Sequence, residues 1–118
     1  MSPLSRVPGL YPHVIDLSTR DGEYVEILGG RPQSAGMRAG LVTLRPGEAV
    51  GRHTTGGCEE VILVLEGQAG VELTGKASMR VQAPMAAYLP PYHEHDVVNT
   101  GSGLLRYIYV VAPVTEHT

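Results

Sequence analysis

The sequence contains no tryptophan, no phenylalanine and only one cysteine, Cys58, among its 118 residues. A single cysteine excludes an internal disulfide framework and predicts a reducing, cytoplasmic location. A basic excess is also absent, because the formal net charge is −3, and we therefore expect no nucleic-acid partner. No apolar run approaches the ~20 residues that span a bilayer, and the first residues lack the apolar stretch of a signal peptide. We therefore expect no membrane association.

What the sequence has is apolar material interrupted at short intervals. Hydrophobic residues make up 42% of the chain, and without Phe and Trp the core must come from Val, Leu, Ile, Met and the six Tyr. The 15 glycines and 9 prolines leave little room for a helix of three turns. The length predicts one domain over 12–113, preceded by an N-terminal arm (1–11) and followed by a tail (114–118).

Short runs with strand character lie between these chain breakers. We expect strands at 13–17, 24–28, 36–44, 49–53, 60–66, 68–73, 79–82, 85–89, 93–99 and 104–111. Glu66 and Gly67 join two of these strands as a tight hairpin turn, with glycine at the position that needs a positive φ. Short strands at such regular spacing predict an all-β sandwich or a closed antiparallel β-barrel.

Polar side chains interrupt the expected strand at 93–99. Side chains alternate between the two faces of a strand, so His93, His95 and Asn99 share one face while Glu94 and Asp96 share the other. The acidic pair suits solvent. We therefore expect the two histidines to point into the protein.

A carboxylate, Glu60, falls by the same alternation on the apolar face of its strand. An unpaired buried carboxylate is costly, so a cation or a set of hydrogen-bond donors should lie beside it. Imidazoles from His53, His93 and His95 meeting Glu60 inside a barrel would form a nitrogen and oxygen site for a first-row transition metal.

These two polar clusters resemble the two sequence motifs of the cupin superfamily. The first motif is matched by Gly47, His53, Thr55, Glu60 and Gly67, and the second by Pro90, Tyr92, His95 and Asn99. The resemblance covers about 39–111, and both motifs occur in the right order. It implies a small, single-domain cupin of the cupin-2 type: an antiparallel β-barrel also described as a double-stranded β-helix or jelly roll.

Two positions depart from the cupin pattern. Thr55 stands where cupins usually carry a second metal-binding histidine, and Tyr92 stands where the second motif has glycine. The resemblance therefore leaves His53, Glu60 and His95 as metal ligands, a set of two histidines and one carboxylate with open positions. We expect His93 to be the fourth ligand. A thiolate ligand from Cys58 is a further option.

Each of these residues also has a structural interpretation. The histidines could be hydrogen-bonded in a metal-free barrel, and His93 could lie at the rim near solvent. Glu60 could pair with Arg38 or Arg52, while Cys58 could be a half-buried thiol without function. Asn99 is interpreted as a structural residue that ties the backbone groups of a loop.

The resemblance implies a metal-dependent enzyme that acts on a small organic molecule, of the dioxygenase, isomerase or lyase type. The cofactor would be a divalent transition metal (Fe, Mn, Ni, Zn or Cu), and His93 would be a catalytic general acid or base. The apolar lining of the site is expected from Met37, Leu41, Ile62, Val64, Met85 and Val97. The alternative is a non-enzymatic ligand- or metal-binding barrel that acts through a partner, and a structural barrel that has lost its metal is a third option.

We also expect a homodimer, because small β-barrels have sheet edges that proteins must cover. The proline-rich arm is better explained as lying against a neighbouring subunit through its apolar residues Leu4, Val7, Leu10 and Tyr11. Residues of the last strand expected to contribute to this interface are Leu105, Tyr107 and Tyr109.

Overall fold

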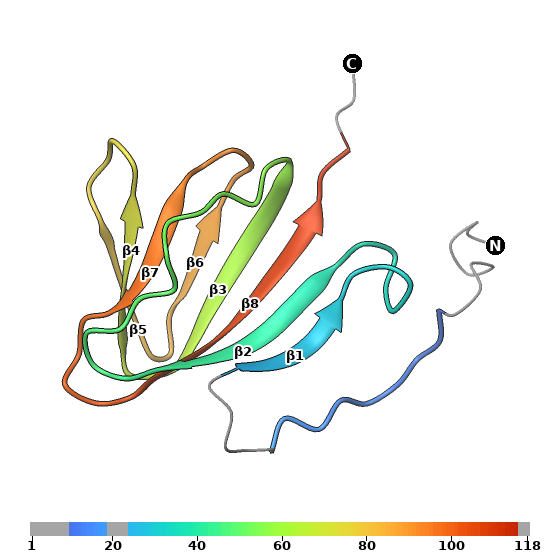
Figure 1. Cartoon of the computed structure of the whole chain (residues 1–118), viewed down its shortest axis with the longest axis horizontal. Helices are drawn as coiled ribbons and strands as arrows, with labels where there is room; N and C mark the ends of the chain where they lie inside the picture. The colour runs from blue at the N-terminus through green and yellow to red at the C-terminus, as the bar shows by residue number, and fades with distance from the viewer. Residues whose placement is uncertain (1–9, 19–23, 116–118) are drawn as a thin grey trace.

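The computed structural model describes residues 10–18 and 24–115, and these residues form eight β-strands and no helix (Figure 1). The strands are β1 (Tyr24–Gly29), β2 (Arg38–Leu44), β3 (Cys58–Glu66), β4 (Gln68–Leu73), β5 (Met79–Gln82), β6 (Ala86–Leu89), β7 (His95–Asn99) and β8 (Leu105–Pro113). The all-β fold expected from the spacing of glycine and proline is therefore confirmed. No helix long and apolar enough to cross a membrane occurs in this part of the chain.

The strands form two antiparallel sheets. One sheet has the order β1-β2-β8-β3-β6, and the other has the order β5-β4-β7. Strands that lie side by side in a sheet come from segments far apart in the sequence, such as β2 and β8 or β4 and β7, as in a jelly roll. Side chains from the inner faces of both sheets meet in a core of Leu44, Ile62, Val64, Ala69, Val71, Val81, Leu89, Val97, Leu105 and Tyr107. The functional candidates lie beside this core, on the same inner faces.

Most of the expected strands are present, with two differences. The run 49–53 forms two isolated β-bridges to β7 rather than a continuous strand. The run 13–17 forms no strand, and Val14 within it is 95% exposed. This run has a strand-like sequence but no neighbouring strand to pair with in the described part of the chain, so residue preference alone does not create a strand there.

The tight turn expected at Glu66 and Gly67 is present, but it is not a hairpin, because β3 and β4 belong to different sheets and do not pair with each other. Gly67 links β3 to β4 with a φ of 86°, a conformation that residues with a Cβ rarely adopt. A Cβ at this position would also overlap the backbone oxygen of Leu104. Glycine is therefore required here by both conformation and space.

Asn99 at the end of β7 ties two loops to the sheet, as expected. Its side-chain amide donates hydrogen bonds to the backbone oxygens of Leu44 (3.0 Å) and Gly103 (2.9 Å). Its side-chain oxygen accepts one from the backbone N–H of Gly101 at 2.9 Å. Asn99 is only 2% exposed, and these three bonds provide its buried amide with partners. They also hold the loop before β8 in place.

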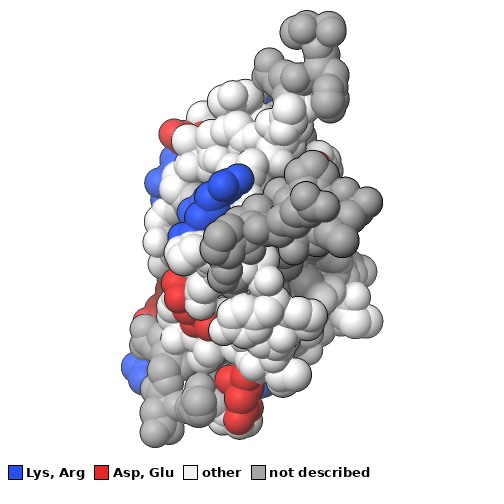
Figure 2. Space-filling view, turned by 90° about the vertical axis from the view of Figure 1, so that its right-hand side faces the viewer, with Lys and Arg blue, Asp and Glu red and all other residues white. Residues whose placement is uncertain are grey.

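The expected contribution of the last strand to a dimer interface is wrong for two of its three residues. Leu105 is 0% exposed and Tyr107 is 3% exposed, because both point into the core of their own chain. Of the expected arm contacts, Leu4 and Val7 lie outside the described residues, whereas Tyr11 is 69% exposed. On the face shown in Figure 2, the described acidic and basic side chains lie in separate small groups on a mostly uncharged surface.

Candidate metal centre

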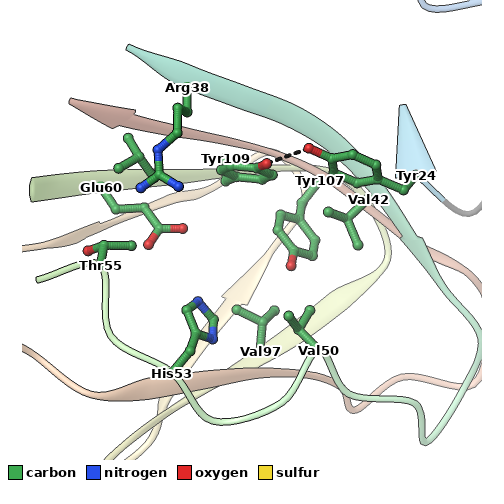
Figure 3. A pocket seen from close by; sticks show the side chains of 11 residues that line it. Tyr24, Arg38, Val42, Val50, His53, Thr55, Glu60, Val97, Tyr107 and Tyr109 are labelled. Carbon is green, nitrogen blue, oxygen red and sulfur yellow. Dashed lines mark hydrogen bonds between the residues drawn. The ribbon is translucent and has the colours of Figure 1, made fainter. Parts of the chain in front are cut away.

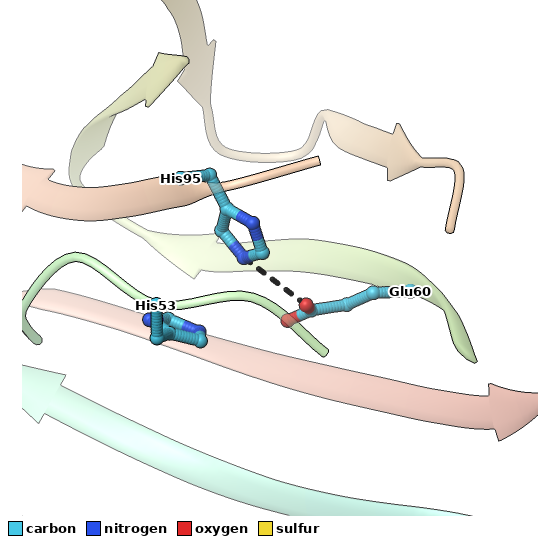
Figure 4. Close-up of side chains that lie close together, drawn as sticks. All are labelled: His53, Glu60 and His95. Atoms are coloured by element: carbon cyan, nitrogen blue, oxygen red, sulfur yellow. Dashed lines mark ion pairs between the residues drawn. The ribbon is translucent and has the colours of Figure 1, made fainter. Parts of the chain in front are cut away.

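Three of the predicted ligands converge at one place on the inner faces of the two sheets. His53, Glu60 and His95 each offer one ligand atom, and these atoms all lie within 4.8 Å of one another (Figure 4). They come from three separate segments: the 49–53 run, β3 and β7. The fold thus assembles a group that the sequence spreads over more than forty positions.

His95 is the first residue of β7, and its side chain points inward and is completely buried. Its Nδ1 lies 2.8 Å from the backbone oxygen of His93. A carbonyl oxygen can only accept, so Nδ1 carries the proton and donates it. In the neutral imidazole, Nε2 therefore presents a lone pair to the site.

A bulge positions His53. The segment between β2 and β3 runs antiparallel to β7 through the bridges Ala49–Val98 and His53–His95. Three residues of this segment lie opposite two residues of β7, so the pairing contains one extra residue. Gly51 is the middle one of these three residues and has a φ of 112°, which glycine adopts without strain. The extra residue places His53 directly opposite His95.

The ring of His53 is oriented in the same way as that of His95, by a hydrogen bond from Nδ1 to a backbone oxygen. Its Nδ1 lies 2.7 Å from the backbone oxygen of Gly51 and must donate to it, which leaves the Nε2 lone pair free. The two ring centroids are 4.5 Å apart. A backbone carbonyl holding Nδ1–H is a common means of orienting a metal-binding histidine.

Glu60 completes the group from β3, where buried and exposed residues alternate. It is 5% exposed, and its Oε1 lies 3.2 Å from His95 Nε2. Neither of these two buried atoms makes a hydrogen bond of good geometry. The Glu60 side chain raises the pKa of His95 above its usual 6.5, although burial of the ring acts in the opposite direction. A proton or a cation between the two atoms would satisfy both.

The donor set fits a divalent transition metal. Two imidazole lone pairs and one carboxylate oxygen converge, and the Nδ1 atom of each imidazole is already held by a backbone carbonyl. Nitrogen and oxygen donors in this combination suit iron, manganese, nickel, copper and zinc. Residues His53, Glu60 and His95 could therefore hold a metal ion.

A cavity of about 320 Å³ opens beside this group (Figure 3). His53 and Glu60 line it together with Thr55, and four valines form its apolar walls. Three tyrosines and Arg38 complete the lining. A cavity of this volume, at the lower end of the about 300–1,000 Å³ of typical ligand sites, suits a small molecule.

The residues that form the apolar lining differ from expectation. Of the six residues expected to line the site, only Val97 lines this cavity. Ile62 and Val64 are buried deeper, in the core, whereas Met37 and Met85 are exposed. Alternation along a strand identifies the inner face but not the depth of a residue along that face.

Tyr107, expected at a subunit interface, instead lines the cavity. Its ring is 3% exposed, and burial together with the negative charge of Glu60 raises the pKa of its hydroxyl well above the usual 10. The hydroxyl therefore stays protonated at neutral pH. It can donate a hydrogen bond to a molecule in the cavity.

His93 is not part of the group of three ligands. It precedes β7 and is half-buried; its Nδ1 donates to the backbone oxygen of Pro91 at 3.0 Å, and its Nε2 lies 3.4 Å from Lys76 Nζ. Strand alternation does not extend to His93 because β7 begins only at His95. Its roles as a fourth ligand and as a general acid or base stay predictions.

The remaining predicted residues have clear positions. Thr55 lines the cavity and its hydroxyl donates to the backbone oxygen of Cys58 at 3.3 Å. Cys58 is half-buried at the start of β3 and does not belong to the ligand group. Arg52 pairs with Glu72 at 3.5 Å near the surface rather than with Glu60.

Tyr92, which replaces the motif glycine, keeps the glycine-like backbone conformation. Its φ is 64°, and it is the only described residue other than glycine with a positive φ. Its N–H donates to the backbone oxygen of Gly56 at 2.8 Å, which joins the two motifs. Tyr92 therefore adopts a backbone conformation that glycine adopts freely, at a cost of about 1–2 kcal/mol.

Two antiparallel sheets with a group of histidine and glutamate side chains between them are typical of the cupin class. A family model described as "Cupin domain" matches residues 40–111, more than half of the chain, and the chain therefore belongs to the cupin family. The resemblance drawn from the two motifs is confirmed. No curated protein matches the sequence.

Solved structures share the fold. TT1209 of Thermus thermophilus is 29% identical with a TM-score of 0.68, covering 85% of this chain and 96% of that one. A Cupin 2 conserved barrel domain protein of Salinispora arenicola is 20% identical with a TM-score of 0.69, covering 88% and 91%. The cupin domain of Schizosaccharomyces pombe Cnp3 is 16% identical with a TM-score of 0.68 over 77% of this chain. This chain covers only 64% of the Cnp3 domain.

Proposed function

We propose that this cupin is a metal-dependent enzyme that acts on a small organic molecule, with a divalent transition metal bound by His53, Glu60 and His95. One observation carries the proposal: Glu60 Oε1 and His95 Nε2 are buried 3.2 Å apart without a hydrogen bond. Uncompensated buried polar atoms are destabilising, and such atoms in a native fold indicate a missing partner. A proton would satisfy this pair alone, whereas a metal ion would also bind the free Nε2 lone pair of His53, which belongs to the same group.

The residues around the group define what the site could do. A divalent ion held by these three ligands would supply Lewis acidity to a bound molecule, which suits isomerase and lyase reactions, and a redox-active ion would be needed for a dioxygenase reaction. The valines of the cavity wall exclude water from a bound molecule, and the protonated Tyr107 hydroxyl can donate to it. His93 is proposed as a general acid or base at the rim.

A second candidate function is a ligand-binding barrel without catalysis. Outside the ligand group, the titratable side chains that line the cavity are arginine and tyrosine. No histidine, carboxylate or cysteine, the usual side-chain bases, lines the cavity beyond the ligand group. This observation favours binding, or a reaction that needs no side-chain base.

Metal analysis of protein purified without chelator tests the metal site. We expect one metal ion per chain in the wild type and none in His95→Ala, with His13→Ala as a control because His13 is exposed and far from the group in sequence. A full equivalent of metal in His95→Ala would contradict the proposed site.

Turnover separates the two functions. The metal-loaded protein is incubated in air with a library of small organic acids and sugars, and the mixture is followed by NMR. Consumption of one compound by the wild type and not by His95→Ala supports an enzyme. A compound that binds at the metal and is recovered unchanged supports the binding barrel.

We also propose that the chain is a cytoplasmic homodimer. The outward face of β3 is apolar, with Val61, Leu63 and Leu65 between 39% and 48% exposed. Tyr88 on the neighbouring β6 is 54% exposed. A stable interface buries more than ~1,200 Å² in total, which a second copy could provide on this face. Size-exclusion chromatography with light scattering should give the mass of two chains, and a mass of one chain would reject the dimer.

A further inference from the structure

Arg38 lies in line with the metal group across three neighbouring strands. Arg38 on β2 is paired with Val111 on β8, and Val111 is paired with Glu60 on β3. Residues paired in this way emerge on the same face of a sheet, with neighbouring strands about 4.8 Å apart. Figure 3 shows the guanidinium of Arg38 and the carboxylate of Glu60 reaching into the same cavity.

The guanidinium of Arg38 has no partner within the described part of the chain. No ion pair or hydrogen bond to Arg38 occurs there. The nearby carboxylate of Glu26 lines a different cavity, between β1 and residues 11–15. Because Arg38 is exposed overall and yet lines the cavity, its charge is at the mouth. An arginine with five donors and no acceptor at a ligand cavity is suited to an anion.

Two tyrosine hydroxyls add a donor in the same cavity. Tyr24 and Tyr109 line it, and their hydroxyl oxygens are 2.6 Å apart. One hydroxyl donates to the other, so the accepting hydroxyl keeps a proton that it can donate elsewhere. The cavity mouth therefore offers a guanidinium and one free O–H.

Gly40 makes this arrangement possible. It lies between the two tyrosines, and a Cβ at this position would lie 2.6 Å from Tyr24 Cε1 and 2.7 Å from Tyr109 Cε2. No heavier residue fits without displacing the rings. The chain thus has glycine where the two aromatic rings meet beside Arg38, two positions away on β2.

The charges in the cavity also favour an anion. A divalent ion and the Arg38 guanidinium, set against the carboxylates of Glu60 and of Glu26, which acts on Tyr109 from beside the cavity, leave one positive charge there. A net positive charge at a cavity with apolar walls favours a bound anion.

We propose that the ligand of this cupin is a small carboxylate, held at its carboxylate end by Arg38 and the Tyr24–Tyr109 hydroxyl pair while another part of the molecule faces the metal group. The planar guanidinium forks onto a carboxylate through two parallel hydrogen bonds, which gives orientation as well as affinity. This inference rests on the proposed function, because the metal defines the other end of the site.

Calorimetric titration of the full chain loaded with Zn²⁺ tests this proposal. The probes are carboxylates of about two to six carbons, including lactate and pyruvate, with lactamide as a neutral molecule of the same shape as lactate. The variants are Arg38→Gln and Arg38→Lys, and the matched control is Arg52→Gln, which removes an arginine outside the cavity. Zn²⁺ alone is titrated into every variant first, and thermal unfolding verifies that each variant is folded.

We expect at least one carboxylate to bind the wild type more tightly than lactamide does. Arg38→Gln should weaken that binding about tenfold or more, as is typical for loss of a charge-assisted hydrogen bond. Arg38→Lys should be intermediate, and Arg52→Gln should equal the wild type. Zn²⁺ affinity should not fall in Arg38→Gln, because the variant removes a positive charge that repels the ion and no metal ligand.

Two results would overturn the proposal: unchanged carboxylate binding in Arg38→Gln, or no binding by any carboxylate of the panel to the wild type. Failure of the proposed metal function would be visible separately, as a wild type that retains no Zn²⁺. In that case the same panel is titrated into the metal-free protein. Carboxylate binding to the metal-free protein that is lost in Arg38→Gln supports the anion site. The lack of any such binding refutes the anion site.

Discussion

Replacing Glu60 with glutamine should raise the stability of the metal-free protein at pH 8 while it removes the metal. In the wild type, once His95 is neutral, a carboxylate oxygen faces the Nε2 lone pair of His95 at 3.2 Å, and neither atom has a hydrogen bond. The amide of glutamine would bring an N–H donor to the same position. We expect an increase in the free energy of unfolding of about 1–3 kcal/mol, the range for satisfying a buried polar group.

The stability that Glu60→Gln gains over the wild type should be larger at high pH than at low pH. Interaction with Glu60 raises the pKa of His95 above 6.5 in the folded metal-free protein. The resulting stabilisation is fully present below the unfolded value of 6.5 and is lost as the pH rises through the higher folded value. The wild type thus has this stabilisation at pH 5.5 and loses it as the pH rises above 6.5 through the folded pKa of His95, and Glu60→Gln does not. The advantage of the variant should shrink or reverse at pH 5.5.

Urea unfolding in the presence of EDTA, followed by circular dichroism at both pH values, measures this effect. Glu59→Gln is the matched control: Glu59 is the neighbouring residue on β3 and accepts a hydrogen bond from the surface residue Tyr88. It should change stability little at either pH. A Glu60→Gln protein less stable than the wild type at pH 8 would refute the reasoning. Glu60→Gln should also lower the affinity of the protein for the metal, by more than the roughly 10–100-fold that follows removal of an outer-shell partner.

Three further predictions concern ligands, loops and association. His95→Ala should weaken metal binding more than about 100-fold and His93→Ala less than about tenfold in a competition titration, because only His95 belongs to the ligand group; equal losses would establish His93 as a ligand. Asn99→Ala should lower the free energy of unfolding in urea by about 2–4 kcal/mol, because it removes three hydrogen bonds at a buried site; a change below about 0.5 kcal/mol would contradict this role. Deleting residues 1–11 should weaken dimerisation in light scattering and leave the β-type circular dichroism spectrum unchanged; a truncated chain that dimerises as tightly as the full one would exclude the arm from the interface.

Alternation along strands predicts the inner faces well. Glu60 and His95 lie on the faces that their neighbours indicate, because Glu60 lies within β3 and His95 is the first residue of β7. The same rule fails for His93, since β7 begins two residues later. It also fails to separate the core from the cavity lining, because depth along a face depends on how the two sheets pack.

Features that depend on contacts between distant segments cannot be predicted from the sequence alone. The bulge at Gly51 that turns His53 toward His95 is visible only once the 49–53 run is paired with β7. The sequence offers Arg38 only as a partner for Glu60, and its place at the cavity mouth follows from its pairing with Val111 on β8. A signal for that place does exist, because Arg38 shares the inward alternation of Val42 on the same strand.

The central claim is that one metal ion binds through His53 Nε2, His95 Nε2 and Glu60. Titration of Zn²⁺ into chelator-treated, ¹⁵N-labelled protein, with the imidazole nitrogens followed by long-range NMR, tests it most directly among the five histidines of the chain. We expect changes that saturate at one equivalent and are confined to Nε2 of His53 and His95, with Nδ1 of both still protonated and bonded to the backbone oxygens of Gly51 and His93. Unchanged Nε2 resonances of His53 and His95 at one equivalent would contradict the claim.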